Sequence, residues 1–362
     1  MKIGIDASRA LRKIKTGTEY YSEQIILNLA KIDHKNNYSL YSNISPKPPL
    51  LNLPNNFHWR VMPFFRGWTL LRLSLEMKKN PPDVLFIPAH TLPLITPKKS
   101  VVMVHDIGFV HFPKLYPARQ KIYHNFVLWY VKKHATHILT PSEFVKNDLI
   151  KTLKIKKSKI TVIYHGFDKK LYQKSADKNH LSVKLIPYIF FLGRLEAKKN
   201  LITLIRAFEI VRKNSKEKIK LVLAGNKSHG YKKIKKEIEK SKFKKDIILP
   251  GYIKEEDVPI WLSSARLFVF PSQNEGFGFP VIEAQACGCP VICSNITSLP
   301  EIADSGALYF NPQDEKDLAN KIIKILNNKE LQKELIKKGS ENIKRFSWAA
   351  AAIKTKNILE SI

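Results

Sequence analysis

The stretch PSQNEGFGFPVIEAQACGCP holds two glutamates, and two of its three glycines lie between them. Gly276 and Gly278 predict a flexible loop, and Pro280 suits the first position of a helix, so Glu275 falls in the loop and Glu283 in the first helical turn. Free backbone N–H groups at such a helix start bind phosphate, while carboxylates accept hydrogen bonds from the hydroxyls of a sugar or ribose. A helix-capping loop with a solvated glutamate is the alternative interpretation.

Two cations follow a strand that ends at Gly193. The sequence FLGRLEAKKNL places Arg194 and Lys199 between this strand and a helical pattern that starts at Leu201. Arginine binds two phosphate oxygens at once and lysine adds a point charge, so the pair suits a diphosphate. Charge-assisted hydrogen bonds contribute roughly 1.5–3 kcal/mol each, enough to help a nucleoside diphosphate leave. Ordinary surface charge is the competing explanation in a chain with 62 lysines and arginines.

Two further signals lie in the first half of the chain. His105 and Asp106 follow the apolar run VVMV, and open α/β sheets bind ligands at such strand ends. His105 could hydrogen-bond a substrate hydroxyl or phosphate, and a buried structural imidazole is the alternative. In the sequence KTGTEYY, Gly17 would let the backbone approach a ligand at the start of a helix expected over Glu19–Ala30.

The elements that must position these residues alternate between short apolar runs and helical patterns. Continuous apolar strands are typical of sheets buried on both faces, and helices between them indicate parallel βαβ units in doubly wound sheets. The expected strands are Ile3–Ile5, Val84–Ile87, Val101–Val104, His137–Thr140, Ile160–Ile163, Tyr188–Leu192, Lys220–Leu223, Ile247–Leu249, Leu267–Phe270 and Val291–Cys293.

The length of 362 residues fits two α/β domains. A polar stretch interrupts the rhythm of strands and helices in the middle of the chain, and we interpret it as a linker. We therefore expect an N-terminal domain over 1–168, a linker over 169–185, a C-terminal domain over 186–345 and a terminal segment over 346–362. In the terminal segment, Ser347 can cap a helix that begins at the next residue.

The net charge of +31 is spread over the whole chain, since the first 168 residues alone hold 26 basic and 10 acidic side chains. Such an excess predicts attraction to phosphates, nucleotides or a charged lipid surface. The three cysteines all lie within 287–293, which is no disulfide framework and indicates a reducing compartment. The first residues lack the pattern of a signal peptide and no apolar run approaches 18 residues, so we expect a cytoplasmic protein that can bind the inner face of the membrane.

Motifs that the sequence lacks narrow the chemistry. No GxGxxG motif follows the first strand, which argues against an enzyme that binds a nicotinamide cofactor. The sequence also lacks the GxxxxGK[ST] motif of a P-loop. No Asp-x-Asp supplies ligands for a metal-bridged sugar nucleotide, and the cysteines lack a histidine at zinc spacing. We therefore expect neither a metal nor a cofactor, and interpret the cysteines as small core residues around a tight turn.

Taken together, these residues make the chain resemble the retaining glycosyltransferases of family 4, which have the GT-B fold of two Rossmann-like domains facing across a cleft. EGFGFPVIE, from Glu275 to Glu283, matches the family's E-x7-E motif. Gly193-Arg194 with Lys199-Asn200 matches its GR…KN stretch, and His105-Asp106 matches its HD. Other matching pieces in the expected order are Pro141-Ser142-Glu143, Tyr164-His165-Gly166, Ala224-Gly225 and Pro250-Gly251-Tyr252. The resemblance covers nearly the whole chain.

The resemblance implies roles for these positions. Arg194 and Lys199 would hold the diphosphate of a nucleotide sugar and stabilise it as it leaves. Glu283 would accept from the ribose hydroxyls and Glu275 from the donor sugar, while His105 would line the reaction centre from the N-terminal domain. The further substrate-binding positions that the resemblance implies are Gly17, Asp106, Gly276, Phe277, Gly278 and Phe279.

The same resemblance implies a metal-independent reaction that retains the anomeric configuration by front-face attack, with the leaving phosphate as base. It also implies that the helix over Trp348–Ser361 crosses back to the N-terminal domain. One departure concerns the first loop, because many members have a second glycine where this chain has Glu19.

The acceptor is expected to bind the N-terminal domain, where two segments mix cations with aromatic residues. Arg60–Lys79 holds Phe64, Phe65 and Trp68 among five cations and one acid. Lys114–Lys133 adds Trp129 and Tyr130 among further cations. Basic amphipathic segments suit an anionic bilayer and a lipid-linked acceptor. A core-facing helix with a cationic outer face is the alternative for either segment.

The sequence thus predicts transfer of a hexose, with mannose as the first guess, from a nucleotide diphosphate sugar to a glycan or lipid-linked acceptor in surface polysaccharide synthesis. Another nucleotide-sugar enzyme of the same fold, an epimerase or a phosphorylase, is the first alternative. The net charge makes a nucleic-acid-binding protein a second alternative. The even charge distribution and the pair Glu275 and Glu283 argue against nucleic acid as a partner.

Overall fold

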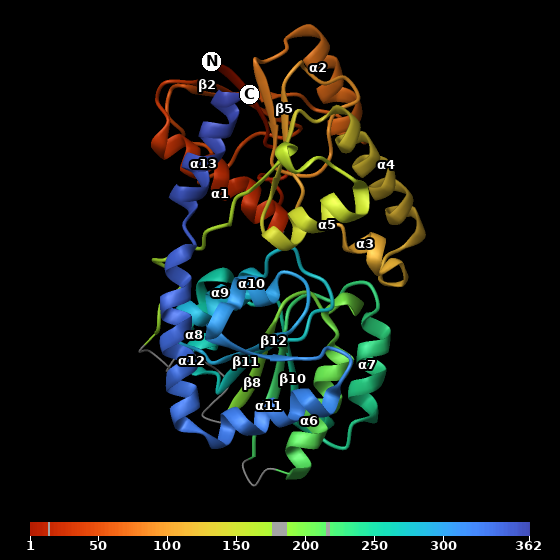
Figure 1. Ribbon diagram of the computed structural model, residues 1–362, viewed down its shortest axis with the longest axis vertical. Helices are drawn as coiled ribbons and strands as arrows, with labels where there is room; N and C mark the ends of the chain where they lie inside the picture. The colour runs from red at the N-terminus through yellow and green to blue at the C-terminus, as the bar shows by residue number, and fades with distance from the viewer. Residues whose placement is uncertain (14, 176–186, 215–217) are drawn as a thin grey trace. The chain divides into compact units, whose positions relative to one another are not determined.

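The computed structural model describes residues 1–13, 15–175, 187–214 and 218–362 (Figure 1). It divides into two compact units, and each is described by itself. The first comprises Met1–Pro113, Pro117–Gly166 and Phe346–Ile362, and the second Lys114–Tyr116 and Phe167–Arg345. Of the linker expected over 169–185, residues 176–185 lie outside the described residues.

The first unit is built around a parallel sheet of seven strands in the order β3-β2-β1-β4-β5-β6-β7. The strand order reverses direction between β1 and β4, which makes this the switch point of a doubly wound sheet. The strands are β1 (Lys2–Asp6), β2 (Asn37–Ser42), β3 (Phe57–Val61), β4 (Val84–Ile87), β5 (Ser100–Met103), β6 (His137–Thr140) and β7 (Ile160–Val162).

Helices connect the strands of the first unit, and the C-terminal helix joins them. They are α1 (Gly17–Ile32), α2 (Leu73–Lys79), α3 (Gly108–His111), α4 (Ala118–His134), α5 (Glu143–Leu153) and α13 (Trp348–Ser361), with a π-helical turn over Trp68–Arg72 and 3₁₀ turns over Pro113–Leu115 and Lys157–Lys159. Helix α13 packs against α1 (Figure 1). Its far end is held by Asn36, whose Nδ2 donates to Glu360 Oε1 at 2.7 Å. The chain end therefore belongs to the first unit.

The second unit is built around a parallel sheet of six strands in the order β10-β9-β8-β11-β12-β13, and its switch point lies between β8 and β11. The strands are β8 (Tyr188–Leu192), β9 (Lys220–Ala224), β10 (Ile247–Gly251), β11 (Leu267–Phe270), β12 (Val291–Ser294) and β13 (Ala307–Phe310). The sheet is apolar in its centre, since all four residues of β11 and of β12 are buried.

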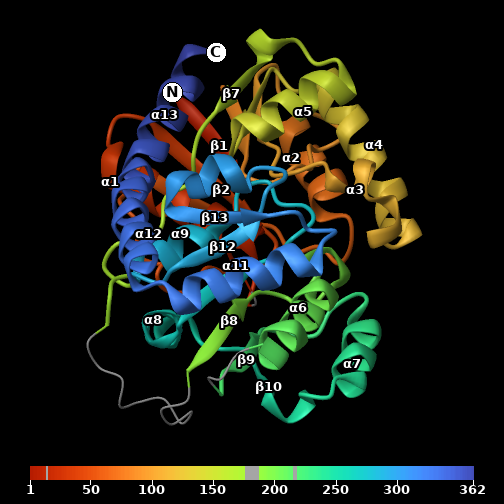
Figure 2. The ribbon, with the colours of Figure 1, turned by 60° about the horizontal axis from the view of Figure 1, so that its bottom comes forward.

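Helices again connect the strands of the second unit. They are α6 (Leu201–Asn214), α7 (Tyr231–Lys240), α8 (Val258–Ser264), α9 (Phe279–Ala286), α10 (Leu299–Ala303), α11 (Glu315–Asn327) and α12 (Lys329–Asn342), with 3₁₀ turns over Ala197–Lys199, Lys244–Asp246, Glu255–Asp257, Asp304–Gly306 and Ile343–Arg345. Helices α6 and α11 lie side by side (Figure 2). Both bury an apolar stripe, which includes Leu204 and Phe208 in α6 and Leu318 and Ile322 in α11.

The structure confirms the predicted fold class of two doubly wound parallel sheets. All ten expected strands are present, with ends that differ from the expected ones by at most two residues. Three strands were not predicted, namely β2, β3 and β13. Polar residues interrupt the apolar pattern in β2 (NYSLYS) and in β3 (FHWRV). Strand β13 (ALYF) is apolar but only four residues long, lies at the edge of its sheet and buries only Ala307 and Phe310.

Within the described residues, no helix is both long enough and apolar enough to cross a bilayer.

Gly225 brings β9 against the turn that follows β8. Its φ is 136°, and an ideal Cβ there would lie 2.0 Å from Gly193 O. Gly251 also has a positive φ, of 82°, but nothing lies within 4 Å of an ideal Cβ there. Gly225 therefore requires glycine both for its positive φ and for the close contact with Gly193 O, whereas Gly251 requires it only for its positive φ.

We predict that Gly225→Ala destabilises the protein much more than Gly251→Ala. The second substitution pays only for positive φ, about 1–2 kcal/mol, whereas the first must also push two strands apart. Urea-induced unfolding of both variants against the wild type measures the difference. Equal shifts in the unfolding midpoint would show that the contact with Gly193 has no energetic weight.

Candidate functional site

The two strongest motifs of the sequence meet at the switch point of the second sheet. The loop after β8 carries Arg194 and Lys199, and the loop after β11 carries Glu275. Open α/β sheets bind ligands beyond the carboxyl ends of the strands at this place, because the two neighbouring loops diverge there. The sheet therefore brings residues about eighty positions apart to one site.

Lys199 and Glu275 form the ion pair at the centre of this site. Lys199 Nζ lies 2.5 Å from Glu275 Oε1, and the two side chains are only 12% and 13% exposed. Ser272 Oγ donates to the same carboxylate oxygen at 2.5 Å. Burial alone would raise the pKa of Glu275, but the charges of Lys199 and Lys198 outweigh it and hold the pKa below its ordinary value. Glu275 is therefore an ionised, acceptor-only group.

Backbone hydrogen bonds fix the two loops to each other and to helix α10. The N–H of Gln273 donates to Lys198 O at 2.9 Å, which ties the β11 loop to the β8 loop. The hydroxyl of Ser298 lies 3.0 Å from Glu275 O and 3.1 Å from Phe277 O. Ser298 is buried at the start of α10 and thus positions the backbone on both sides of Gly276.

The glycine-rich stretch forms the start of helix α9. Gly278 has a φ of 106° and caps the helix, and Phe279 is its first residue. The rings of Phe277 and Phe279 meet edge to face with centroids 5.2 Å apart. This start corrects two expectations, because Pro280 is the second residue of α9 rather than the first, and Glu283 is the fifth and lies in the second turn rather than the first.

Glu283 is buried in helix α9, where the described residues that act on its charge are Glu255 and Tyr172. Burial raises its pKa to about 8, the charge of Glu255 adds to the rise, and a hydrogen bond with Tyr172 opposes it. Near neutral pH the carboxyl is therefore mostly protonated. In that form it donates one hydrogen bond and accepts others, which suits a pair of neighbouring hydroxyls.

Arg194 differs from Lys199 in exposure and in partner. Its side chain is 48% exposed, and its NH2 lies 3.3 Å from Glu196 Oε1 within the same turn. Lys198 approaches the same oxygen of Glu196 at 3.8 Å. The guanidinium is thus oriented by a local carboxylate and remains accessible to solvent, which suits a group that binds an incoming anion.

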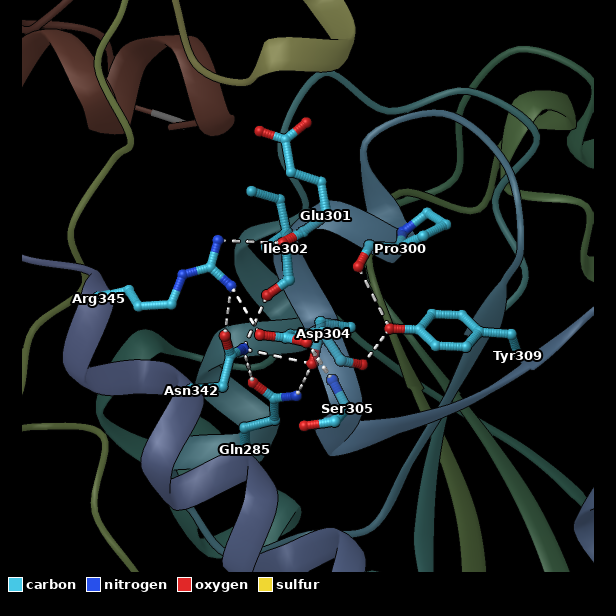
Figure 3. A network of polar contacts seen from close by, with 10 residues as sticks. Gln285, Pro300, Glu301, Ile302, Asp304, Ser305, Tyr309, Asn342 and Arg345 are labelled. Atoms are coloured by element: carbon cyan, nitrogen blue, oxygen red, sulfur yellow. Dashed lines mark hydrogen bonds and ion pairs between the residues drawn. The ribbon is translucent and has the colours of Figure 1, made fainter.

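A buried polar network holds helix α9 against α10 and α12 (Figure 3). Gln285 of α9 donates from Nε2 to Ala303 O at 2.8 Å, and Asn342 of α12 donates from Nδ2 to Gln285 Oε1 and to Ile302 O, both at 2.8 Å. Arg345 donates to Asn342 Oδ1 at 2.9 Å. The network thereby fixes the helix that carries Glu283.

In the first unit, the expected pair His105 and Asp106 follows β5, and both side chains are held in place. His105 Nε2 lies 2.9 Å from Pro88 O, so this nitrogen carries the proton, because a carbonyl oxygen only accepts. Burial lowers the pKa of His105. Asp106 Oδ1 accepts from the N–H of Gly108, the first residue of α3, at 3.0 Å.

Gly17 begins helix α1, and Glu19 occupies the helix start. The carboxylate of Glu19 accepts from the backbone N–H of Thr16 at 3.1 Å and also binds its hydroxyl, and it pairs with Arg9 at 3.2 Å. Donors that an anion would use at this helix start are therefore partly satisfied within the chain. This is the structural consequence of having a glutamate where the resembling family often has glycine.

Sequence reasoning missed His90, Ser272 and Ser298. His90 follows strand β4 directly after Pro88-Ala89, so the strand-end argument applied to His105 would also have found it. Ser272 contacts Glu275 in its own loop and Lys198 O in the β8 loop. Ser298 contacts the backbone of the β11 loop from the start of α10. No local sequence pattern indicates either serine.

The three cysteines are free and buried, which confirms the interpretation as core residues. In the described part of the chain, no group of three or more histidine, cysteine, aspartate or glutamate side chains lies close enough to hold a metal ion.

Comparison with known proteins places the chain among the glycosyltransferases. The family model "Glycosyl transferases group 1" matches residues 173–342, and "Glycosyltransferase Family 4" matches residues 25–171. The chain is 26% identical to O-antigen chain mannosyltransferase B of Escherichia coli over 99% of both chains.

Two solved structures show the same fold over the whole chain. Sucrose-phosphate synthase from Thermosynechococcus elongatus matches with a TM-score of 0.80 and 18% identity over 99% of this chain and 98% of its own. Anabaena HepE in complex with UDP and glucose matches with a TM-score of 0.76 and 17% identity over 100% and 99%. These likenesses confirm the predicted GT-B fold.

We predict that Glu283→Gln changes how stability depends on pH. With a folded pKa of about 8 against an ordinary 4.5, Glu283 opposes folding progressively as pH rises from 4.5 to 8, and by a constant amount above 8. The stability gained by Glu283→Gln over the wild type should therefore widen across this range and then level. Thermal unfolding at a series of pH values measures it.

Glu330→Gln is the control for this prediction, because the side chain of Glu330 is 81% exposed. Its stability relative to the wild type should stay nearly constant over the same pH range. A constant difference for Glu283→Gln as well would contradict the protonated state of the buried carboxyl.

Proposed function

We propose, from the premise that this chain belongs to glycosyltransferase family 4, that it moves a hexose from a nucleotide diphosphate sugar to a glycan or lipid-linked acceptor in surface polysaccharide synthesis. The observation that carries the proposal is the ion pair of Lys199 and Glu275 at the switch point of the second sheet. The full-length likeness to an O-antigen mannosyltransferase supports mannose as the sugar.

The cations of the β8 loop bind the diphosphate in this proposal. Arg194 is accessible and offers a planar fork to two oxygens, and Lys199 supplies a point charge beside it. Negative charge grows on the diphosphate as the bond to the sugar breaks. Fixed cations in a partly buried site stabilise that charge more than they stabilise the bound substrate, and this lowers the barrier.

The carboxyl groups bind hydroxyls in this proposal. Glu275 is ionised and held by Lys199 and Ser272, so it presents a fixed acceptor to a hydroxyl of the donor sugar. Glu283 bears a proton near neutral pH and takes the paired hydroxyls of the ribose, donating to one and accepting from the other. The backbone over Gly276–Phe279 faces the sugar and phosphate.

The proposed reaction retains the anomeric configuration and needs no metal. The acceptor hydroxyl attacks the anomeric carbon on the face from which the diphosphate departs, and its proton passes to a leaving phosphate oxygen as the new glycosidic bond replaces the old one. Arg194 and Lys199 supply the positive charge that this leaving group requires. His105, Asp106 and Gly17 are the substrate-facing residues proposed for the first unit.

We further propose a cytoplasmic enzyme bound to the inner face of an anionic membrane. In α4, Ile122 is 72% and Trp129 54% exposed, and Lys133 Nζ lies 5.5 Å from the Trp129 ring centroid. Exposed apolar and aromatic groups among cations suit a lipid headgroup layer. The aromatic residues of the other segment, Arg60–Lys79, differ in exposure, because Trp68 is buried and Phe65 is 91% exposed.

We predict that Arg194→Ala and Glu275→Ala each lower turnover by at least about two orders of magnitude, as expected when a group that stabilises the reacting charge or sugar is lost. Glu275→Gln keeps the shape of the side chain and removes only its charge. Comparing it with Glu275→Ala therefore separates the loss of the charge from the loss of packing around the buried Lys199. A thermal-shift panel of nucleotide sugars, with GDP-mannose first, identifies the donor, and release of nucleoside diphosphate with a glycosylated product measures turnover.

Arg206→Ala is the matched control, because Arg206 forms a comparable ion pair with Glu237 at 2.6 Å between α6 and α7. It should leave turnover unchanged. Near-normal rates for a folded Arg194 or Glu275 variant would remove that residue from the site. An isomerised sugar as product would favour the epimerase, and a sugar phosphate would favour the phosphorylase. Loss of activity with EDTA would contradict the proposed metal independence. A product with inverted anomeric configuration would contradict the proposed retention.

We predict that the protein sediments with anionic vesicles and that this binding weakens at high salt, because it combines charge attraction with apolar insertion. Trp129→Glu should reduce the bound fraction several-fold. Ile353→Glu is the control, since Ile353 is 49% exposed on α13 of the same unit. Absence from vesicles at every salt concentration, or equal loss in both variants, would refute the proposed surface.

A further inference from the structure

The switch point of the first sheet holds a second cluster of polar side chains. It lies between β1 and β4, as the site of the second unit lies between β8 and β11. Arg9 follows β1, His90 follows β4, and His105 and Asp106 follow the neighbouring strand β5. The rule that places ligands beyond the strand ends therefore applies to this cluster as well.

His90 has an unsatisfied nitrogen at this place. Its Nε2 is shielded from solvent and has no hydrogen-bond partner in the part of the chain that the structure describes. Burial, with the neighbouring His124, His105 and Arg9, lowers the pKa of His90 to about 3, so the ring is neutral. Leaving a buried polar atom unpaired costs about 1–3 kcal/mol, which a bound ligand would recover.

Aromatic rings from α3 and α4 stand beside this nitrogen. The rings of His90 and His124 have centroids 5.0 Å apart, and His124 stacks on Phe109 at 5.0 Å with an interplanar angle of 28°. The hydroxyl of Tyr123 is hydrogen-bonded to Thr91 Oγ1 at 3.0 Å. Ring faces and neutral polar groups therefore lie together at the strand ends.

A cavity of about 450 Å³ adjoins the cluster, because Phe109 belongs to both. Pro113, Lys121, Ile122 and Asn125 are among its other lining residues. Its volume lies in the range of small-molecule sites, and its lining is mostly apolar with two polar groups. The cavity therefore meets the cluster at Phe109, and it is large enough for a sugar ring.

The charges around His90 favour a neutral polyhydroxylated ligand over an anion. The carboxylate of Asp106 acts on His90 and on His124, and the charge of Arg9 is already paired with Glu19 at 3.2 Å. A phosphate would meet neutral imidazoles and a like-charged carboxylate here. Sugar hydroxyls both donate and accept, and the C–H face of a sugar ring packs on aromatic faces.

We propose that His90 and His124 form the subsite that binds the acceptor sugar, with His90 Nε2 hydrogen-bonded to a hydroxyl of that sugar and the stacked rings of His124 and Phe109 beside its apolar face. This inference rests on the proposed glycosyl transfer and names the part of the first unit that selects the acceptor. His90 is thereby a specificity-determining residue, while the donor is bound by the second unit.

Kinetics of three variants test the subsite. His90→Phe keeps the ring and removes the hydrogen bond, so the KM for the acceptor should rise about ten-fold, as for the loss of one buried hydrogen bond. His90→Gln offers a polar group of similar reach and should restore most of the affinity. The KM for the donor and the slow hydrolysis of the donor by water should stay at wild-type values in both. These donor readouts keep a failed subsite distinguishable from a failed proposed function.

His137→Phe is the control, because His137 is the first residue of β6, at the amino end of that strand, whereas the cluster lies beyond the carboxyl ends, and its Nε2 lies 2.8 Å from Thr161 Oγ1. Its acceptor KM should match that of the wild type. An unchanged acceptor KM in His90→Phe, or an equal rise in His137→Phe, overturns the proposal.

Binding without turnover provides a second test. In protein labelled with ¹⁵N-histidine, the signal of His90 is assigned by its loss in His90→Phe. The probes are the methyl glycosides of mannose, glucose, galactose and N-acetylglucosamine, with inorganic phosphate and glycerol alongside. Movement of the His90 and His124 signals with a methyl glycoside, and not with glycerol, supports the subsite. No movement with any glycoside, or movement with phosphate alone, overturns it.

Discussion

One buried ion pair determines the form of the candidate donor site. Lys199 and Glu275 come from loops at the ends of two adjacent strands, and each would be an uncompensated charge in a mostly buried place without the other. Removing one partner of such a pair is strongly destabilising, so the two loops are bound to one arrangement. That arrangement keeps an ionised carboxylate and a cation side by side, where a sugar and a diphosphate would meet.

The rest of the second unit supports this constraint from both sides. Gly225 lets β9 approach the turn that carries Arg194, and Ser298 holds the backbone of the glycine-rich loop. Behind the loop, Gln285 and Asn342 tie helix α9 to α10 and α12 through hydrogen bonds that leave little freedom to a buried helix. A site that must stabilise developing charge requires this degree of preorganisation.

The two units use the same geometry with different chemistry. Each sheet changes direction once, and each places polar side chains beyond the strands that flank the change. In the second unit these are a cation and a carboxylate, which suit a charged donor, and in the first they are neutral imidazoles beside aromatic rings. This division agrees with an enzyme of glycosyltransferase family 4 that must hold an anionic and a polyhydroxylated substrate.

The sequence by itself determined the α/β class, ten of the strands and the motifs around Arg194 and Glu275, because continuous apolar runs and glycine-rich strand ends are local signals. It did not reveal β2, β3 and β13, whose pairing comes from neighbours rather than from their own residues. Only the tertiary structure decided that Lys199 meets Glu275, that Glu283 is buried beside Glu255 and Tyr172, and that His90 Nε2 has no partner among the described residues. The physical reason is that burial and partners depend on segments distant along the chain, and no local pattern records them.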